Sequence, residues 1–401
     1  MPELPVEGPI NWKDWVTWLA EVEWPMPSTE LTDAGTVFHG LEQKTAFVTG
    51  PLRAAAGRKF TSITPGQQSR FAVAIARGDA TFEVSANSQF LSLMRVLSLQ
   101  LEAALAAGKE KEAAELVPLL FTVRDLLGSD VSLIDLLIRN TADRILADAL
   151  QRNLAAGLMP SAALEEFQRG FAARPVLDDM DRLLNMELAW SCYMMDQVVK
   201  QRASWDTIKF FFQDPKDFLN ELIFIAEKGF SCLSRLNKAA AIRIFLDNIH
   251  AWKTGGLAGY YRAVTTRDEQ PERSTFGTLL HLDSFLVDGA ARGMSSLAKR
   301  VIHTEMRRRV LLIACGLERH RLAGNTPPPD LPGLPKNLLA AIPSDLDGKP
   351  LRYRRNEDGW VIWSVGLDLQ DDLKGEAPPQ SQKDSITFAD WQWRYKNTDR
   401  R

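Results

Sequence analysis

Apolar residues along most of the chain recur every three or four positions, which is the spacing of an amphipathic helix. The clearest run lies between Phe90 and Leu105, and Gly108 follows it in the position of a helix terminator. The same rhythm predicts further helices over residues 109–127, 131–156, 160–173, 176–202, 214–229, 230–252 and 288–322. Short connections containing Gly or Pro join several of them. The pattern therefore predicts a mainly α fold of antiparallel helical hairpins forming a bundle.

Gly and Pro residues interrupt this helical rhythm at defined places. Breakers within residues 34–60 predict several short helices there. Pro118 should kink its helix or mark the true start of that helix. Gly255-Gly256 should end the preceding helix, and residues 265–275 have the composition of a polar loop. Pro327–Pro329 should stop the last long helix firmly.

The pattern changes after residue 326, where Pro and Gly become frequent and the helical rhythm is lost. Leu351–Arg354 and Trp360–Trp363 have the pattern of strands, and Asn356–Gly359 between them has the composition of a hairpin turn. Phe388–Trp393 is a candidate third strand. This region predicts a small C-terminal antiparallel β-hairpin module packed against the last helix.

These patterns divide the chain into three parts. Residues 1–60 are a Trp-rich N-terminal segment with short helices, residues 61–325 are the helical body, and residues 326–401 hold the Pro/Gly-rich linker and the β module. Trp12 and Trp15 share a helix face in the first part and lie close to Trp18. This Trp cluster either packs a helix onto the body or docks a partner.

The composition narrows the class of protein. Apolar residues make up 45% of the 401 residues, which suits a globular fold, and a net charge of −3 does not indicate nucleic-acid binding. Apolar runs such as Leu116–Phe121 are far shorter than the roughly 18 residues of a membrane span. The first residues lack the basic and apolar regions of a signal peptide. We therefore expect either a cytoplasmic protein or a chain that begins after a removed anchor.

Motifs that would announce catalysis are missing from the sequence. It contains no G-x-S-x-G elbow, no phosphate-binding Gly-rich loop and no H-E-x-x-H zinc motif. His281–Asp283 and His303–Glu305 are close pairs, but side chains two positions apart on a helix point in different directions. Three widely spaced cysteines predict buried free thiols: Cys192, Cys232 and Cys315. An active site scattered along the chain stays open as an alternative.

Two segments near the C-terminus carry a resemblance. Ile342 to Tyr353 contains the pattern P-x-D-x-x-G-x-P, and Ser364 to Leu369 follows S-x-G-x-D up to a final position where Leu replaces Gly. This tail, about 50 residues long, resembles the C-terminal β segment of type II secretion major pseudopilins. Together with the helical body, it is similar to a group of uncharacterised bacterial helical proteins, often with an N-terminal anchor. The resemblance implies a folding module and a cell-envelope location.

The resemblance also implies a calcium site in the loop after the hairpin. In pseudopilins that loop binds calcium through aspartates and backbone carbonyls. The matching positions of this chain are Asp368, Asp371 or Asp372, and Asp390. Calcium prefers six to eight oxygen ligands, which such a loop can supply in part. The alternative is a solvated acidic loop, because Leu369 and two lysines depart from the pattern.

Basic residues outnumber acidic ones on the last long helix, where Arg307-Arg308-Arg309 stand in a row. A basic face suits an acidic protein, a phosphate-rich polymer or lipid headgroups. Three consecutive arginines span about 200° of a helix, so at least one should lie beside the core and pair with a carboxylate. This arrangement makes ion pairs with acidic helices the simpler interpretation. An Arg row also excludes this helix from a pilus core or a bilayer.

These observations favour a non-enzymatic binding or scaffold protein of the cell envelope with a calcium-binding tail. The alternative is a hydrolase-like enzyme with a site between the helical body and the C-terminal module. A pocket with converging His or Asp side chains would favour the enzyme, and a filled junction would favour the scaffold.

Arg139 and Glu187 each interrupt an otherwise apolar helix face, and we predict that they pair across two packed helices. Removing one partner of such a pair leaves the other charge buried, at a cost of about 3–5 kcal/mol. Arg139→Met should therefore lower the free energy of unfolding by that amount in a urea titration. A change below about 0.5 kcal/mol, the size of an ordinary surface effect, would contradict the pairing.

Overall fold

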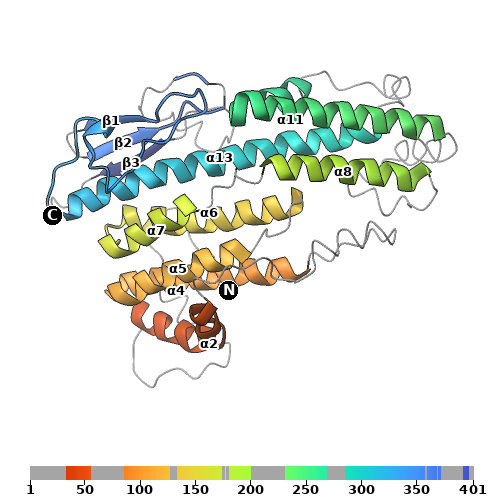
Figure 1. Ribbon diagram of the computed structural model, residues 1–401. Coiled ribbons are helices and arrows are strands. Elements are labelled where there is room, and N and C mark those ends of the chain that lie inside the picture. The colour runs from red at the N-terminus through yellow and green to blue at the C-terminus, as the bar shows by residue number, and fades with distance from the viewer. Residues whose placement is uncertain are drawn as a thin grey trace.

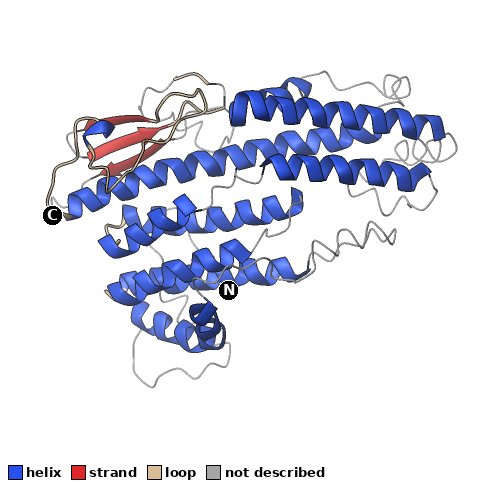
Figure 2. Ribbon diagram, in the orientation of Figure 1, coloured by secondary structure: helices blue, strands red, loops and turns tan. Residues whose placement is uncertain are grey.

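The computed structural model is mainly helical with one small antiparallel sheet, as the sequence predicts. It describes residues 33–55, 85–126, 133–173, 177, 180–199, 231–268, 285–356, 359–367, 369–371 and 392–396. The helices are α2 (Ala34–Ala55), α4 (Ser85–Ala106), α5 (Glu110–Leu126), α6 (Leu133–Ala155), α7 (Ser161–Ala173), α8 (Met180–Val199), α11 (Ser231–Asp268) and α13 (Phe285–Leu322). A short 3-10 turn, η3 (Leu331–Gly333), precedes the strands. Figure 2 shows the sheet beside one end of the helices.

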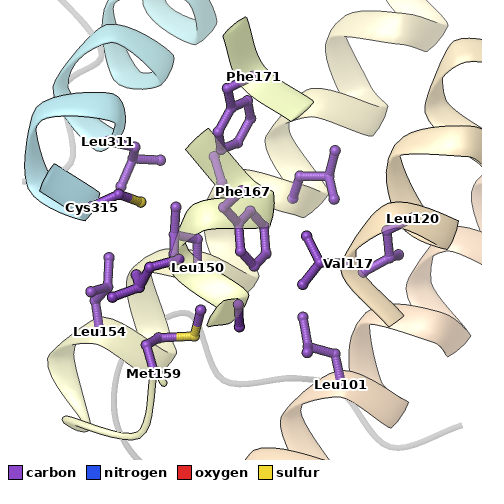
Figure 3. Packing of buried hydrophobic residues seen from close by; sticks show 14 of the residues in the cluster. Leu101, Val117, Leu120, Leu150, Leu154, Met159, Phe167, Phe171, Leu311 and Cys315 are labelled. Atoms are coloured by element: carbon purple, nitrogen blue, oxygen red, sulfur yellow. The ribbon is translucent and has the colours of Figure 1, made fainter. Parts of the chain in front are cut away.

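A first hydrophobic core lies among α2, α4, α5, α6, α7 and the C-terminal half of α13. Figure 3 shows its centre, where Phe167 of α7 faces Val117 of α5, and Cys315 of α13 approaches from the other side. The rings of Phe121 and Phe171 meet edge to face, with centroids 5.1 Å apart. Such interdigitated apolar packing accounts for most of the stability of a helical domain.

A second hydrophobic core lies among α8, α11 and the N-terminal half of α13. Leu184 of α8, Tyr260 of α11 and Ile302 of α13 are almost fully buried there. Helix α13 therefore contributes to both cores, and Figure 1 shows it running from beside the sheet to the side of α8 and α11. Its 38 residues span about 57 Å at 1.5 Å per residue. None of the described helices is both long enough and apolar enough to cross a membrane.

The sheet has the order β1-β2-β3, with β1 at Arg352–Asn356, β2 at Gly359–Trp363 and β3 at Gln392–Lys396. Both strand pairs are antiparallel, and Asn356 faces Gly359 across the predicted hairpin turn. Trp360 to Trp363 are all buried, so both faces of β2 are covered. The predicted hairpin is confirmed. The third strand is also present, and the structure describes Gln392–Lys396 of it.

Helix ends are set by glycine at the predicted places. Gly108, Gly157 and Gly324 have φ angles of 71°, 68° and 82°, a region that favours glycine. The next residue in each case donates its N–H to a carbonyl one turn back. The bonds are Lys109 to Ala104 at 2.8 Å, Leu158 to Asn153 at 3.0 Å, and Asn325 to His320 at 3.2 Å. This is the glycine cap expected from the sequence.

Prolines and glycines inside helices are where the sequence prediction was wrong. Helix α5 begins at Glu110 and continues through Pro118, so Pro118 does not mark its start. Helix α2 is one helix that includes Pro51, in place of several short ones. Helix α11 breaks at Gly256 as predicted, with φ 56° and ψ −144°, but helical structure resumes and extends to Asp268. Residues 265–268 are therefore helical, where the sequence predicted a loop.

Several sequence predictions lie outside the described residues. They include the Trp cluster at Trp12–Trp18, the helix over 214–229 and most of the loop after residue 268.

Gly170 of α7 and Gly50 of α2 offer a matched test of the first core. A Cβ at Gly170 would lie closer than 3.0 Å to the Phe121 ring, whereas one at Gly50 would meet nothing within 4 Å. Gly170→Ala should therefore destabilise the protein by about 1–3 kcal/mol through overpacking. Gly50→Ala should change the free energy of unfolding by less than about 0.5 kcal/mol, because the gain in helix propensity is opposed by the Pro51 ring, which crowds a Cβ on the residue before it. Urea unfolding measures both variants, and equal losses would contradict the packing.

Candidate functional site

The junction between the helical body and the β module is filled with apolar side chains. Leu351, Trp360 and Ile362 are 3%, 1% and 0% exposed and belong to the first core. They share that core with Val310 and Leu311 of α13. This is where a site between body and module was expected, and the described side chains there form a packed interface.

Asp345 is the polar centre of the module, and its side chain is completely buried. One carboxylate oxygen, Oδ1, accepts hydrogen bonds from the Leu346 N–H at 2.7 Å and from the Ser364 hydroxyl. The other, Oδ2, accepts from the Val365 N–H at 2.9 Å and from the Arg352 guanidinium. Four donors therefore satisfy both oxygens of this buried carboxylate. Asp345 therefore joins the loop before β1, strand β1 and the loop after β2.

Charged side chains near Asp345 also connect the module to helix α13. The Arg352 guanidinium donates to Asp347 and lowers the pKa of that carboxyl below its usual value. Arg309 of α13 donates to the Ser344 backbone carbonyl and also to the Glu305 carboxylate at 2.7 Å. The module is thus fastened to α13 by hydrogen bonds as well as by the apolar junction.

The module contacts the second core through the loop before β1 and through the segment after β2. Leu346 of the loop belongs to that core, and Leu367 and Leu369 of the segment pack against it. Leu369 has a φ of 63°, a left-handed conformation that costs an L-residue about 1–2 kcal/mol. It stands where the resembling pattern has Gly. Packing of the Leu369 side chain against the second core accompanies this backbone strain.

A second group of buried charges joins three helices at the C-terminal end of α7. Arg124 of α5, fully buried, donates to the Gly170 carbonyl at 3.2 Å and to Asp143 of α6 at 3.3 Å. Arg308 of α13 donates to the Phe171 carbonyl at 2.7 Å. Cations at the C-terminus of a helix satisfy its last carbonyls and its dipole. Two arginines therefore hold α7 against α5, α6 and α13.

Burial and neighbouring charges act on the carboxylates of this group in opposite ways. Burial raises the pKa of Asp143, although the charges of Arg124, Arg139 and Arg308 oppose that effect. Burial also disfavours the charged form of Glu305, but hydrogen bonds and charge from Arg308 and Arg309 outweigh it and lower its pKa. Glu305 is therefore ionised in the folded protein at neutral pH.

The arginines of α13 are engaged in ion pairs, and two of these pairs confirm the predicted pairing with other helices. Arg307 pairs with Asp148 of α6, and Arg319 pairs with Glu165 of α7. Arg308 and Arg309 pair with Glu305, and Arg321 pairs with Glu318, all within α13. Arg308 lies beside the core, as the helix geometry predicts.

Of the residues predicted to bind calcium, the structure describes Asp371. Asp368, Asp372 and Asp390 lie outside the described residues, and Asp371 is exposed and accepts a hydrogen bond from the Trp363 indole at 2.8 Å. Within the described ranges, no group of three or more His, Cys, Asp or Glu side chains is gathered for a metal. The calcium site stays a prediction.

Arg139 is buried on α6, where its charge acts on Asp143. Glu187 is half-buried on α8, and its charge adds to the burial that raises the pKa of Tyr260. Their mutual pairing also stays a prediction. Cys315 is buried as predicted, and Cys192 is half-buried. Burial raises the pKa of both thiols, which makes them poor nucleophiles.

Sequence reasoning missed the role of Asp345, although its motif was recognised, and it missed the Arg124–Asp143 pair. A signal for the pair exists in the sequence, because Arg124 directly follows the apolar run Leu116–Val123, in which only Pro118 and Thr122 are not apolar. A charge embedded in such a run must find a buried partner.

Asp345→Asn should cost roughly 1.5–3 kcal/mol of unfolding free energy. An amide nitrogen cannot accept the hydrogen bonds that one carboxylate oxygen accepts from the Val365 N–H and from Arg352, although Arg352 keeps its ion pair with Asp347. Asp330→Asn is the matched control. Asp330 is exposed and accepts the Gly333 N–H at 3.0 Å, which an amide oxygen can also accept. Urea unfolding followed by tryptophan fluorescence measures both variants. Equal losses would show that Asp345 does not hold the module.

Substitutions at Leu369 test the left-handed backbone. Leu369→Gly and Leu369→Ala lose the same side-chain packing, so their difference reports the backbone alone. The Gly variant should be more stable than the Ala variant by roughly 1 kcal/mol, the reverse of the usual order. Thermal unfolding compares them, and the usual order would rule out a left-handed conformation at residue 369.

Calcium binding by the tail should raise the melting temperature. With about 1 mM calcium and a dissociation constant near 10 μM, linkage gives about 2.7 kcal/mol of stabilisation relative to EDTA. The shift should disappear in Asp368→Ala. An unchanged melting temperature in the wild-type protein would leave the β module as a purely structural element.

Comparisons with known proteins identify no relative of this chain. No protein-family model, no curated protein and no solved structure matches this chain. What the protein does is therefore inferred from its own residues and their geometry.

Proposed function

We propose that this chain is a non-enzymatic helical scaffold that binds a protein partner. The observation that carries the proposal is the way its buried carboxylates are used. Asp143, Glu305 and Asp345 each accept hydrogen bonds from an arginine. In each case the carboxylate or its arginine also forms a hydrogen bond with another element of the fold. A catalytic group needs to face a cavity that admits substrate. These carboxylates face other parts of the chain.

The filled junction supports the same proposal. Trp360 and Ile362 occupy the space where an enzyme of the alternative class would have its substrate pocket. The buried thiol of Cys315 lies within the first core, with no exposed surface for a substrate to reach. These features favour binding through the outer surface.

The shared helix α13 gives the scaffold its rigidity. Both cores pack on α13, and Arg309 ties the β module to it. Surfaces on α2, α11 and the β module are thereby presented in fixed relation to one another. Placement at the cell envelope is part of the proposal and is supported by the pseudopilin-like tail alone.

Site-specific photo-crosslinking in the cells that make the protein tests this function. A photoreactive amino acid would replace exposed residues on separate elements, such as Phe47 of α2, Leu246 of α11 and Asn356 of β1. We expect a discrete protein adduct of constant mass from some of these positions. The matched control places the same residue at Leu158, which is exposed at the end of α6.

Two outcomes would overturn the scaffold proposal. The first is a scan of exposed positions that yields no protein adduct beyond the level of an unrelated protein. The second is depletion of a small molecule from a cell extract by the purified protein, with turnover proportional to its concentration. The second result would establish the enzyme in place of the scaffold.

A further inference from the structure

Strand β1 lies at the edge of the sheet, and its outer half is accessible. The sheet order β1-β2-β3 leaves β1 with one neighbouring strand among the described residues. In an antiparallel pair, every second residue of an edge strand directs its N–H and C=O away from its neighbour. Arg354, Arg355 and Asn356 are exposed. This half of β1 is therefore available to another extended segment.

A groove of about 470 Å³ runs beside this edge. It is lined by Pro329 and by four consecutive residues of β1, Tyr353–Asn356. Consecutive side chains of a strand point to opposite faces of the sheet. A hollow that touches four residues in a row therefore follows the edge of the strand rather than one face of the sheet.

The far wall of the groove is held in place and cannot itself pair with β1. The Tyr353 hydroxyl donates to the Pro328 carbonyl at 2.8 Å, and burial raises the pKa of Tyr353 to about 12, so the donor proton is kept at neutral pH. Leu331 and Leu334 anchor the following turn in the first core. Pro327–Pro329 have no N–H groups, so they offer no donors to the carbonyls of β1.

The charge of the edge selects the occupant. Arg354 and Arg355 are adjacent and exposed, so their side chains lie on opposite faces of the sheet. Arg355 forms no ion pair with any residue that the structure describes. A second copy of β1 would place arginines opposite arginines, which is unfavourable in a strand pair. A segment with carboxylates at alternate positions would place opposite charges there.

We propose that the edge of β1 binds an extended acidic segment of a protein partner as an added strand, in the groove against Pro329. This inference rests on the scaffold function and names the element that contacts the partner. Main-chain hydrogen bonds supply the attraction common to any strand, and the exposed charge of Arg355 supplies the preference for acidic sequences.

The test is fluorescence anisotropy of the full chain with short labelled peptides. In one peptide Glu alternates with Val, in a second Lys replaces Glu, and a third is the acidic peptide with alternate backbone nitrogens methylated. We expect binding of the first peptide alone, because methylation removes the strand donors and Lys repels the edge. The double variant Arg354→Glu/Arg355→Glu should weaken binding about tenfold, which corresponds to about 1.4 kcal/mol. Arg243→Glu, an exposed substitution on α11, should leave binding unchanged.

Several results would overturn the inference. Equal binding of the methylated acidic peptide would show charge attraction without strand pairing, and equal binding of the Lys peptide would exclude selection by charge. Unchanged affinity in the double variant, with an unchanged melting temperature, would place the site elsewhere. Binding to vesicles of phosphatidylglycerol but to no peptide would make the edge a lipid contact. Any of these failures leaves crosslinks from α2 or α11 intact, so the scaffold proposal would be judged separately.

Discussion

The structure depends on one buried carboxylate, that of Glu305, near the middle of α13. Burial alone would favour its neutral form, but Arg308 and Arg309 hold it ionised. Each of these arginines then reaches outward, Arg308 to the last turn of α7 and Arg309 to the loop before β1. The residues just before Glu305 belong to the second core, and those just after Arg309 belong to the first. Glu305 therefore stands where both cores and the β module meet.

This arrangement explains why charge in the interior is compatible with a stable fold. An isolated buried charge costs several kcal/mol, and the geometry must be good for a pair to repay it. Arg124 and Arg308 meet that condition by satisfying helix carbonyls in addition to carboxylates. The interior charges thus order the helices relative to one another. On the outer surface, the edge of β1 combines a groove with exposed positive charge.

Local signals predicted the elements well where backbone chemistry decides them. Gly108, Gly157 and Gly324 end their helices because only glycine adopts a positive φ without strain. Pro51 misled the prediction and Pro118 is not a helix start, because a proline inside a helix removes one hydrogen bond but leaves the apolar face intact. In α5 the residues on both sides of Pro118, Val117 and Leu119, are buried. The packing of these side chains outweighs the cost of the lost hydrogen bond. Rules based on neighbouring residues in the sequence do not include this packing.

The sequence by itself determined the helical class, the helix ends at glycine and the place of the hairpin, because these follow from periodicity and from residues a few positions apart. Only the tertiary structure decided which polar groups meet. Arg124 finds Gly170, Arg308 finds Phe171, and Gln168 donates to the Leu338 carbonyl at 2.7 Å, over separations of 46, 137 and 170 residues. Such pairings depend on how the helices pack in three dimensions. The periodicity of a helix indicates which of its faces is buried, but it does not indicate which distant residue that face contacts.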